Sequence, residues 1–341
     1  MRIAVYYNNR DVRLEERPIP GTGPDELLVK VMASGICGSD VLEWYRIKKA
    51  PLVLGHEIAG EVTKVGEKVE RFKVGDRVFV SHHVPCNKCH YCLSGHHTAC
   101  ETLHTTNYDP GGFSEYIRVP RVNVETGTYL LPDELSFEDA TFIEPLACVI
   151  RGQRLARIEP QHSVLVLGSG VAGLLHIQLV KARGGKRVVA TDISKYRLEA
   201  AKKFGADVML NSKNLDQGIL RSENDGRLAE RVIVCAGAYS AVTQAFESVD
   251  RGGTILFFAV PPPDKNVYVP MTDFWRNEIT LMTSYGAGPD DLAESLRLLG
   301  SGRVNVHEMI THRLGLAQTG VGFQLVADAS ESLKVIIEPQ K

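Results

Sequence analysis

Four cysteines stand close together in one short stretch of the chain. They are Cys86, Cys89, Cys92 and Cys100, in the spacing C-x2-C-x2-C-x7-C. Four thiolates in a compact loop make a closed tetrahedral zinc site that leaves no position open for a substrate. An iron–sulfur run shares the first three cysteines but continues with three residues and a Cys-Pro pair, whereas here seven residues intervene and Glu101 follows. The spacing therefore predicts a structural zinc ion. With four thiolates available, the neighbouring histidines are expected to face solvent: His82, His83, His90, His96 and His97.

Three further fragments offer ligands for a second metal ion. They read CGSD at 37–40, GHE at 55–57 and EPLA at 144–147. Taken singly, each has an ordinary explanation: a core cysteine, a solvated strand edge, or the start of a helix. Together they supply a thiolate, an imidazole and two carboxylates, the ligand types of a catalytic zinc that keeps one position open. The candidate ligands are Cys37, His56, Glu57 and Glu144.

A glycine-rich turn indicates a dinucleotide site. Gly168, Gly170 and Gly173 have G-x-G-x-x-G spacing, directly after an apolar run and at the start of a helical pattern that includes Val171 and Ala172. In this context the motif cradles a pyrophosphate at the helix N-terminus. Asp192 ends the next strand pattern, where a carboxylate binds both adenosine ribose hydroxyls and repels a 2′-phosphate. The motif therefore predicts NAD rather than NADP.

The chain shows two different sequence patterns, which predict two kinds of domain for these residues. Up to about residue 150, short Val-rich runs separated by Gly, Pro and Asp predict a β-rich domain, with strands at 27–32, 61–65 and 77–80. From residue 163, strands at 163–167, 187–191, 231–235 and 254–259 alternate with helices at 171–183 and 194–204. That alternation predicts a doubly wound parallel sheet. A helix near 290–299 and a strand at 333–337 are expected to return to the first domain.

Composition and charge narrow the class of protein. Apolar residues make up 44% and charged residues 23% of 341 residues, and the net charge is −2. This balance gives no reason to propose nucleic acid or an anionic membrane as partner. The chain has no apolar run long enough for a membrane span or a signal peptide, and seven cysteines is an odd number for a disulfide framework. We therefore expect a cytoplasmic protein.

At this point the whole chain resembles the zinc-containing medium-chain dehydrogenase/reductase family. The similar motifs occur in family order and also include GGFSEY at 111–116 and ITHR at 310–313. Gly38 after the first zinc cysteine, and Glu-Pro-Leu at 144–146, are similar to the sorbitol and threonine dehydrogenase branch. The resemblance implies a GroES-like catalytic domain at 1–146 and 287–341, and a Rossmann NAD-binding domain at 147–286. It also implies an active site in the cleft between the domains and a homotetramer or homodimer.

The resemblance further implies a role for each site residue. Cys37, His56 and either Glu57 or Glu144 bind the catalytic zinc, and the remaining carboxylate is close enough to exchange. Ser39 is hydrogen-bonded to the zinc-bound alcohol, and Asp40 orients His56. Related enzymes often carry a proton-relay histidine where this chain has Leu42, so we expect Ser39 to pass its proton to water or a zinc-site carboxylate. The cofactor side is expected to use Asp192, Arg197, Ala236, Ala259 and Val260.

The predicted activity is hydride transfer between a polyol-type secondary alcohol and NAD, with two zinc ions per chain. Two alternatives stay open. An amino-alcohol dehydrogenase of the threonine type uses the same ligand set. A non-catalytic dinucleotide-binding protein would need no zinc ligands, and these are present. Trp44, Tyr45 and Arg46 line either the substrate pocket or the core.

Overall fold

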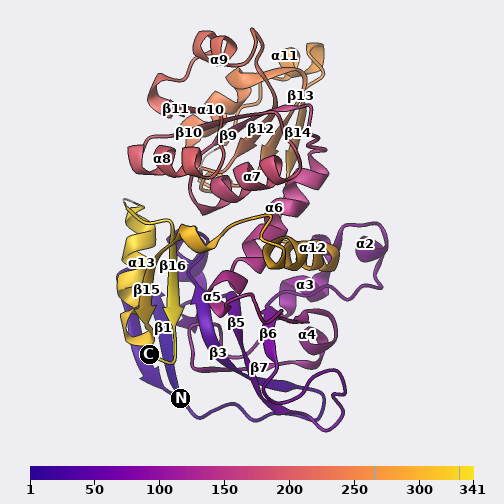
Figure 1. The fold of residues 1–341 in the computed structure, drawn as a ribbon, viewed down its shortest axis with the longest axis vertical. Helices are drawn as coiled ribbons and strands as arrows, with labels where there is room; N and C mark the ends of the chain where they lie inside the picture. The colour runs from indigo at the N-terminus through magenta and orange to yellow at the C-terminus, as the bar shows by residue number, and fades with distance from the viewer. Residues whose placement is uncertain (265, 330) are drawn as a thin grey trace. The chain divides into compact units, whose positions relative to one another are not determined.

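The computed structural model describes residues 1–264, 266–329 and 331–341. The chain forms two compact units, Met1–Ala147 with Ala287–Lys341, and Cys148–Gly286. The expected fold class is confirmed: one unit is a GroES-like β domain and the other a Rossmann-like parallel sheet (Figure 1).

The β-rich unit is built from two sheets. The smaller has the order β2-β1-β4, with bounds Asp11–Glu16, Arg2–Asn8 and Leu52–Val53. The larger has the order β15-β16-β3-β5-β6-β8, and β7 also pairs with β3. Its strands are β3 (Leu27–Gly35), β5 (Glu57–Val65), β6 (Arg77–Ser81), β7 (Tyr116–Val119), β8 (Thr128–Leu130), β15 (Ile310–Gly315) and β16 (Lys334–Glu338). Because β16 pairs with β3, residues about 300 positions apart in the chain meet in one sheet.

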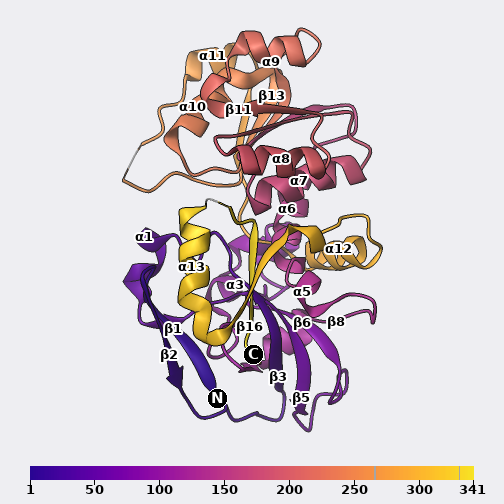
Figure 2. The ribbon, with the colours of Figure 1, turned by 60° about the vertical axis from the view of Figure 1, so that its left-hand side comes forward.

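The β-rich unit also contains seven α-helices of 4 to 12 residues among its described residues. They are α1 (Glu43–Arg46), α2 (His90–Leu93), α3 (Glu101–Thr105), α4 (Arg121–Thr126), α5 (Phe137–Ala140), α12 (Pro289–Gly300) and α13 (Thr319–Asp328). In Figure 2, α13 runs alongside the strands labelled β1 and β16. Phe323 of α13 is fully buried and its ring packs on those of Tyr6 and Phe113. The helix is therefore held to the sheet by an apolar core to which the first and last parts of the unit both contribute.

The other unit is a six-stranded sheet in the order β11-β10-β9-β12-β13-β14, with every neighbouring pair parallel. The strands are β9 (Ser163–Leu167), β10 (Arg187–Asp192), β11 (Val208–Asn211), β12 (Ala229–Val234), β13 (Val249–Phe257) and β14 (Thr280–Thr283). The helices are α7 (Val171–Ala182), α8 (Lys195–Lys203), α9 (Gln217–Glu223), α10 (Tyr239–Ser248) and α11 (Met271–Arg276). Figure 2 shows α10 and α11 on one face of this sheet and α7 and α8 on the other.

Both faces of the central strands of the parallel sheet are buried. Leu165, Val232 and Ile255 point toward α10 and share one cluster with Val242 and Phe274. All five residues of β9 are buried, which explains why its sequence is a continuous apolar run rather than an alternating one. Each fully buried Leu, Val or Ile side chain contributes about 1.5–3 kcal/mol. The sheet therefore gives the glycine turn that follows β9 a rigid support.

Two elements that carry candidate ligands differ from the sequence expectation. Helix α6 (Ile143–Leu155) was expected only as a helix start at Glu144-Pro145, yet it runs for 13 residues. Strand β5 begins at Glu57, four residues before the predicted start at 61. Its first four residues are all buried, so the alternation that marks a half-buried strand is absent there.

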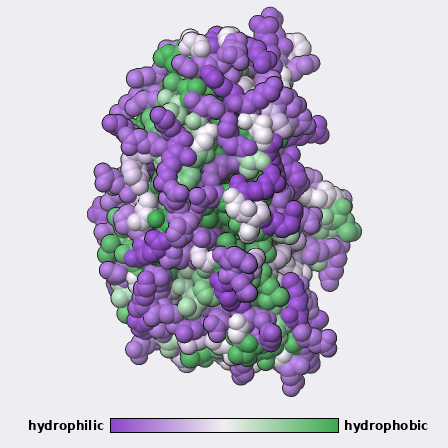
Figure 3. Space-filling model, viewed as in Figure 1, coloured by the Kyte–Doolittle hydropathy of each residue, from purple (hydrophilic) through white to green (hydrophobic). Residues whose placement is uncertain are grey.

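The surface face in Figure 3 is mainly hydrophilic, with small apolar patches scattered over it. Within the described part of the chain, every helix is too short or too polar to span a lipid bilayer.

Candidate functional site

A tight loop after β3 carries the first candidate ligand. The Asp40 N–H donates to the Cys37 carbonyl (3.0 Å), and the Asp40 carboxylate accepts from the Cys37 N–H (3.1 Å). Asp40 is fully buried, and its Oδ1 lies 3.3 Å from His56 Nδ1 and 3.5 Å from Arg46 Nη2. Burial favours the neutral acid, but His56 and Arg46 outweigh it and lower the pKa of Asp40. Asp40 is therefore a carboxylate that fixes both the loop and the histidine.

His56 lies directly before β5 and just after a glycine that the fold requires. Gly55 has φ +92°, and a Cβ there would lie 2.8 Å from the Phe113 N atom. Burial opposes protonation of His56, but the charges of Asp40 and Cys37 raise its pKa well above the usual value. With Nδ1 directed at Asp40, Nε2 is the nitrogen left for a metal ion. The site favours a positive charge at this position, which a metal ion would supply.

Glu57 is half of a fully buried ion pair. Its Oε2 contacts Lys334 Nζ on β16, and both side chains are 1% exposed. The ammonium group also lies 5.3 Å from the centre of the Phe142 ring. Gly35 makes room for the pair, because a Cβ at Gly35 would lie 2.3 Å from Glu57 Oε2. Lys334 was not among the residues that the sequence suggested.

The three candidate ligands come together as one group. One ligand atom each from Cys37, His56 and Glu57 lies within 4.8 Å of the others. Bond lengths of about 2.0–2.3 Å in a tetrahedral zinc site place ligand atoms roughly 3.3–3.8 Å apart, which this spacing accommodates. The thiolate, imidazole and carboxylate set fits a zinc ion with one position open.

Glu144 belongs to the same neighbourhood but is outside that group of three among the described residues. It is half-buried near the start of α6. The pKa of Tyr108 is raised well above its usual value, mainly by burial and further by the negative charges of Asp40, Glu144 and Glu57. The Tyr108 hydroxyl donates to the Gly55 carbonyl at 3.2 Å. Tyr108 is thus a second buried polar residue at the site that the sequence did not suggest.

Two histidines that were expected to face solvent lie beside the site instead. In the β5–β6 register Glu57 pairs with Ser81, so the flanking residues His56 and His82 fall opposite each other. Their ring centres are 4.9 Å apart, and the ring of His83 is 3.9 Å from that of His82. Burial lowers the pKa of both, that of His83 to about 4. The expectation was wrong for this pair because register, not local sequence, decides where they lie. His90 and His96 are exposed, and His97 is half-buried.

The four-cysteine lobe has the geometry of a closed metal site. One Sγ from each of Cys86, Cys89, Cys92 and Cys100 lies within 4.8 Å of the others, and no disulfide joins them. The Cys86 N–H donates to the Cys100 Sγ at 3.4 Å. Burial opposes ionisation of Cys100, but donation from backbone N–H groups, that of Cys86 first, lowers its pKa. Backbone donors to a thiolate and four converging sulfurs fit a zinc ion.

The glycine turn lies where the strand order of the parallel sheet reverses, between β9 and β12. Gly168 has φ +100°, and a Cβ there would lie 3.1 Å from that of Ala236 across this switch point. A Cβ at Gly173 would lie 2.0 Å from the Gly168 carbonyl oxygen, so only glycine fits. Ligands of open α/β sheets bind at such a point.

Asp192 faces the glycine turn from the end of β10. Its carboxylate accepts from the Ser169 N–H and the Ser194 N–H, both at 2.9 Å. Arg197 Nη1 lies 3.9 Å from the position of a Cβ on Gly170. Both predicted cofactor residues therefore lie beside the turn, with an anion and a cation available to the adenosine end of a dinucleotide.

The predicted loops after β12 and β13 lie next to each other. A Cβ on Gly237 would lie 3.2 Å from the Val260 carbonyl oxygen. Ala236 and Ala259 are half-buried, and Val260 is exposed. Val171 and Ala172 open helix α7 after Gly170, with their N–H groups in its first turn. The structure thus groups these residues around the carboxyl ends of the central strands.

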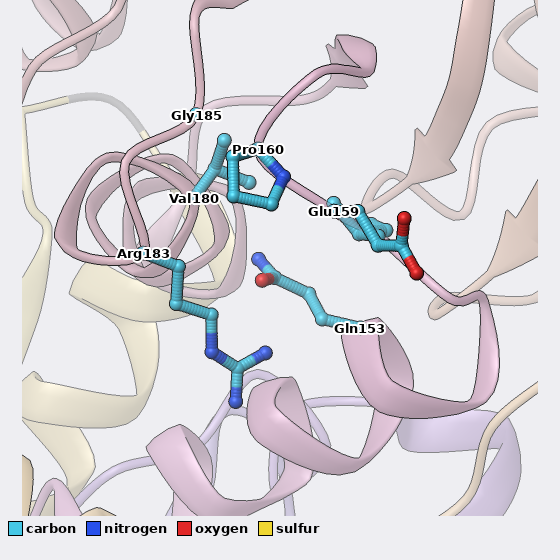
Figure 4. Close-up of a pocket in the computed structure, with 7 residues that line it drawn as sticks. Gln153, Glu159, Pro160, Val180, Arg183 and Gly185 are labelled. Atoms are coloured by element: carbon cyan, nitrogen blue, oxygen red, sulfur yellow. The ribbon is translucent and has the colours of Figure 1, made fainter.

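A separate small pocket lies at the other end of α7 (Figure 4). Its lining includes Gln153, Glu159, Pro160, Val180 and Arg183. A 12-residue helix is about 18 Å long, so this pocket is remote from the glycine turn and is no part of the dinucleotide site.

Comparison with known proteins agrees with the fold. The family described as alcohol dehydrogenase GroES-like domain matches residues 23–128, and the family described as zinc-binding dehydrogenase matches residues 172–301. Sorbitol dehydrogenase of Bacillus subtilis is 33% identical over 100% of this chain and 98% of its own. The probable D-xylulose reductase A of Aspergillus clavatus is 35% identical over 96% and 93%.

Two solved structures share the fold over nearly their whole length. A zinc-binding dehydrogenase of Sinorhizobium meliloti, bound to NADP, has a TM-score of 0.87 and 26% identity over 99% of each chain. An alcohol dehydrogenase of Escherichia coli CFT073, complexed with NADH, has a TM-score of 0.88 and 27% identity over 99% of each chain. This chain therefore belongs to the zinc-containing medium-chain dehydrogenase/reductase family, as its motifs predicted. Within that family it is a zinc-dependent alcohol oxidoreductase close to the polyol dehydrogenases.

Proposed function

We propose that this enzyme oxidises a secondary alcohol of the polyol type to a ketone, with NAD as hydride acceptor, and catalyses the reverse reduction. The observation that carries the proposal is the convergence of Cys37, His56 and Glu57. Ser39 is on the same loop as Cys37. The similarity to sorbitol dehydrogenase and D-xylulose reductase over almost the whole chain supports the polyol class.

Each residue has a defined task in this proposal. Bound zinc would supply Lewis acidity at the alcohol oxygen, and bound NAD would accept the hydride. The Ser39 hydroxyl takes the proton from the alcohol and passes it to water or to a site carboxylate. Asp40 holds His56 in the tautomer that presents Nε2 to the zinc. Cys37, His56 and either Glu57 or Glu144 hold the zinc.

The choice between the two carboxylates bears on how the site works. Lys334 already neutralises Glu57, which weakens the attraction of that carboxylate for a cation. We therefore propose that Glu144 competes with Glu57 for the zinc and that the two exchange.

NAD is the proposed cofactor because Asp192 faces the glycine turn. A carboxylate at this position accepts hydrogen bonds from the ribose hydroxyls and repels the 2′-phosphate of NADP. Comparing kcat/KM for the two cofactors with one alcohol tests this choice. Equal values, or a preference for NADP, would contradict it.

We propose a second, structural zinc in the four-cysteine lobe, and an environment that keeps thiols reduced, as the cytoplasm does. The four sulfurs converge and all seven cysteines lack a disulfide. A closed thiolate site contributes folding free energy and takes no part in the reaction. Two zinc ions per chain by metal analysis would support this assignment, and one or none in chelator-free protein would contradict it.

A homodimer or homotetramer is also proposed. Strand β14 is at the edge of the parallel sheet. Apolar side chains are exposed on and near it, with Trp275 78%, Met271 66% and Leu281 38% exposed. A second copy that pairs with this edge would cover them. Sedimentation or light scattering measures the mass, and a monomer at micromolar concentration would contradict the proposal.

One substrate panel tests the reaction. Sorbitol, xylitol, a cyclic polyol, 2,3-butanediol and threonine are offered with NAD, and NADH absorbance is followed. Turnover of the polyols supports the proposal. Preference for threonine supports the amino-alcohol alternative, and no turnover of any alcohol by zinc-loaded protein supports the non-catalytic one.

A further inference from the structure

The residue at the end of helix α1 contacts the proposed proton-transfer serine. Arg46 Nε donates to the Ser39 carbonyl at 3.0 Å, and Nη2 donates to the Ser39 hydroxyl at 3.1 Å. Nη2 also lies 3.5 Å from Asp40 Oδ1. Only 15% of the Arg46 side chain is exposed. The guanidinium group is therefore fixed one hydrogen bond away from the hydroxyl that is proposed to contact the substrate.

Arg46 has hydrogen-bond donors that the protein does not use. Its hydrogen bonds use Nε and Nη2, and within the described ranges no residue accepts a hydrogen bond from Nη1. A guanidinium has five N–H groups in a planar fork that matches two oxygens of a carboxylate or phosphate. Nη1 thus offers two N–H groups to a molecule that binds beside Ser39.

Cations and carboxylates both lie around this group. The single charge of Asp40 is shared between His56 and Arg46. Lys49 adds a second cation, since its Nζ and the Arg46 guanidinium lie 5.8 Å and 4.8 Å from the centre of the Tyr45 ring. Partial burial lowers the pKa of the half-buried His83, and the charges of Arg46 and Lys49 add to that effect. On the acidic side, Glu43 of the same helix accepts a hydrogen bond from the Asn9 N–H.

Such a site suits an anion better than a neutral hydroxyl. Desolvating a guanidinium is costly, and a neutral partner returns less of that cost than a charged one. Ser39 Oγ is 3.1 Å from Nη2, and an alcohol oxygen on Ser39 would add about 2.7 Å. The reacting oxygen then lies within roughly 6 Å of the guanidinium, so a carboxylate or phosphate one to three carbons away along the chain can reach it.

We infer that Arg46 recognises an anionic oxygen group on the substrate, so that the preferred substrate is a polyol chain bearing a carboxylate or a phosphate. This inference rests on the proposed function and specifies its substrate class. Arg46 is then a specificity-determining residue, and its contact with Ser39 places the anion next to the reacting carbon.

The test uses the zinc-loaded enzyme with NAD and three substrates with the same six-carbon chain length: sorbitol, gluconate and sorbitol 6-phosphate. We expect kcat/KM to be at least tenfold higher for one or both anions than for sorbitol. Arg46→Gln should reduce kcat/KM for the preferred anion about 10- to 100-fold, mainly through KM, the range for a lost charge-assisted hydrogen bond. The loss for sorbitol should be much smaller. Arg46→Lys, which keeps the charge without the fork, should fall between.

The matched control is Lys48→Gln, which removes one positive charge from an exposed lysine two positions away. It should leave the anion-to-sorbitol ratio within about twofold. The ratio also cancels any general damage that Arg46→Gln does to Ser39. Calorimetric titration of gluconate and sorbitol 6-phosphate into the enzyme–NADH complex gives a second readout that needs no turnover, and Arg46→Gln should weaken binding of the preferred anion by a similar factor.

The outcomes separate the two proposals. A preference for gluconate assigns a carboxylate, and one for sorbitol 6-phosphate assigns a phosphate. If sorbitol is oxidised and the ratio is the same in Arg46→Gln as in the wild type, the inference is overturned and the proposed function stands. If no alcohol of either panel is oxidised, the proposed function is wrong, and the inference, which rests on it, is wrong as well.

Discussion

Replacing Lys334 by methionine should destabilise the catalytic domain strongly. The side chains of Lys334 and Glu57 are each 1% exposed. Lys334→Met keeps most of the aliphatic stem but, in protein freed of the catalytic zinc, leaves the Glu57 carboxylate buried without a cation. Removing one partner of a buried ion pair costs about 3–5 kcal/mol, largely because the remaining charge is uncompensated. We expect a loss of that size in the free energy of unfolding.

The magnitude can be assigned to the pair by a double-mutant cycle. Glu57→Gln in the Lys334→Met background removes the unpaired charge, so the double variant should recover more than half of the loss. Lys341→Met is the control, because Lys341 pairs with Glu338 at the surface with its side chain 61% exposed. That change should cost less than about 1 kcal/mol.

The assay relies on the placement of the two tryptophans. Trp44 belongs to the catalytic domain and Trp275 to the coenzyme domain. Trp275 is 78% exposed in one chain and lies at the proposed contact with a second copy, so Trp275→Phe keeps an aromatic side chain there and leaves Trp44 as the sole tryptophan reporter. Urea unfolding at pH 7 is followed by Trp44 fluorescence, and zinc per chain is measured for each variant. A loss below about 1 kcal/mol for Lys334→Met, or a double variant no more stable than the single one, would refute the reasoning.

Four further predictions concern the zinc lobe, the cofactor, proton transfer and acid stability. Cys92→Ser should lower the zinc content by one ion per chain and speed proteolysis within 86–100; an unchanged content argues against the structural zinc. Asp192→Ala should lower the ratio of kcat/KM for NAD to kcat/KM for NADP at least tenfold, since it removes both the attraction for the ribose hydroxyls and the repulsion of the 2′-phosphate. An unchanged ratio would argue against the ribose contact. Ser39→Ala should lower kcat about 10²–10⁴-fold, and near-normal kcat across pH would exclude the relay. His176 is fully buried, and burial lowers its pKa from 6.5 to about 3. Because the unfolded chain then binds more protons, stability should fall by up to about 2.7 kcal/mol as pH drops from 6.5 to 4.5; urea midpoints should show a shallower dependence in His176→Gln, and equal slopes would contradict this.

Local patterns predicted the parts of the fold that local forces decide. The strand at 163–167 was predicted with the bounds that β9 has, because a buried parallel strand is a short apolar run bounded by turn residues. The glycine turn could also be predicted from local sequence, because the steric contact that requires Gly173 is with Gly168, only five positions away. The start of β5 was missed because its buried half shows no alternation.

The site residues that the sequence missed are those that depend on pairing between distant segments. Lys334 meets Glu57 across 277 positions of the chain, through strands that pair with β3 from opposite sides. No local pattern marks a lysine inside an apolar strand as the partner of a particular glutamate. His82 likewise meets His56 only through the β5–β6 register. Arg46 was assigned to either the substrate pocket or the core, because the short segment before His56 gives no indication of which way its side chains turn.

The discontinuity of the catalytic domain has a consequence for biosynthesis. Residues 148–286 form the coenzyme domain as one uninterrupted stretch. Strand β16, which completes the larger sheet of the catalytic domain, is made only after that stretch has left the ribosome. Until Lys334 has been synthesised, Glu57 lacks the lysine that pairs with it. Burying the first half of β5 before then would leave the Glu57 carboxylate without that partner, which is unfavourable. Translation order therefore favours a nascent chain whose coenzyme domain folds first and whose catalytic domain is completed last.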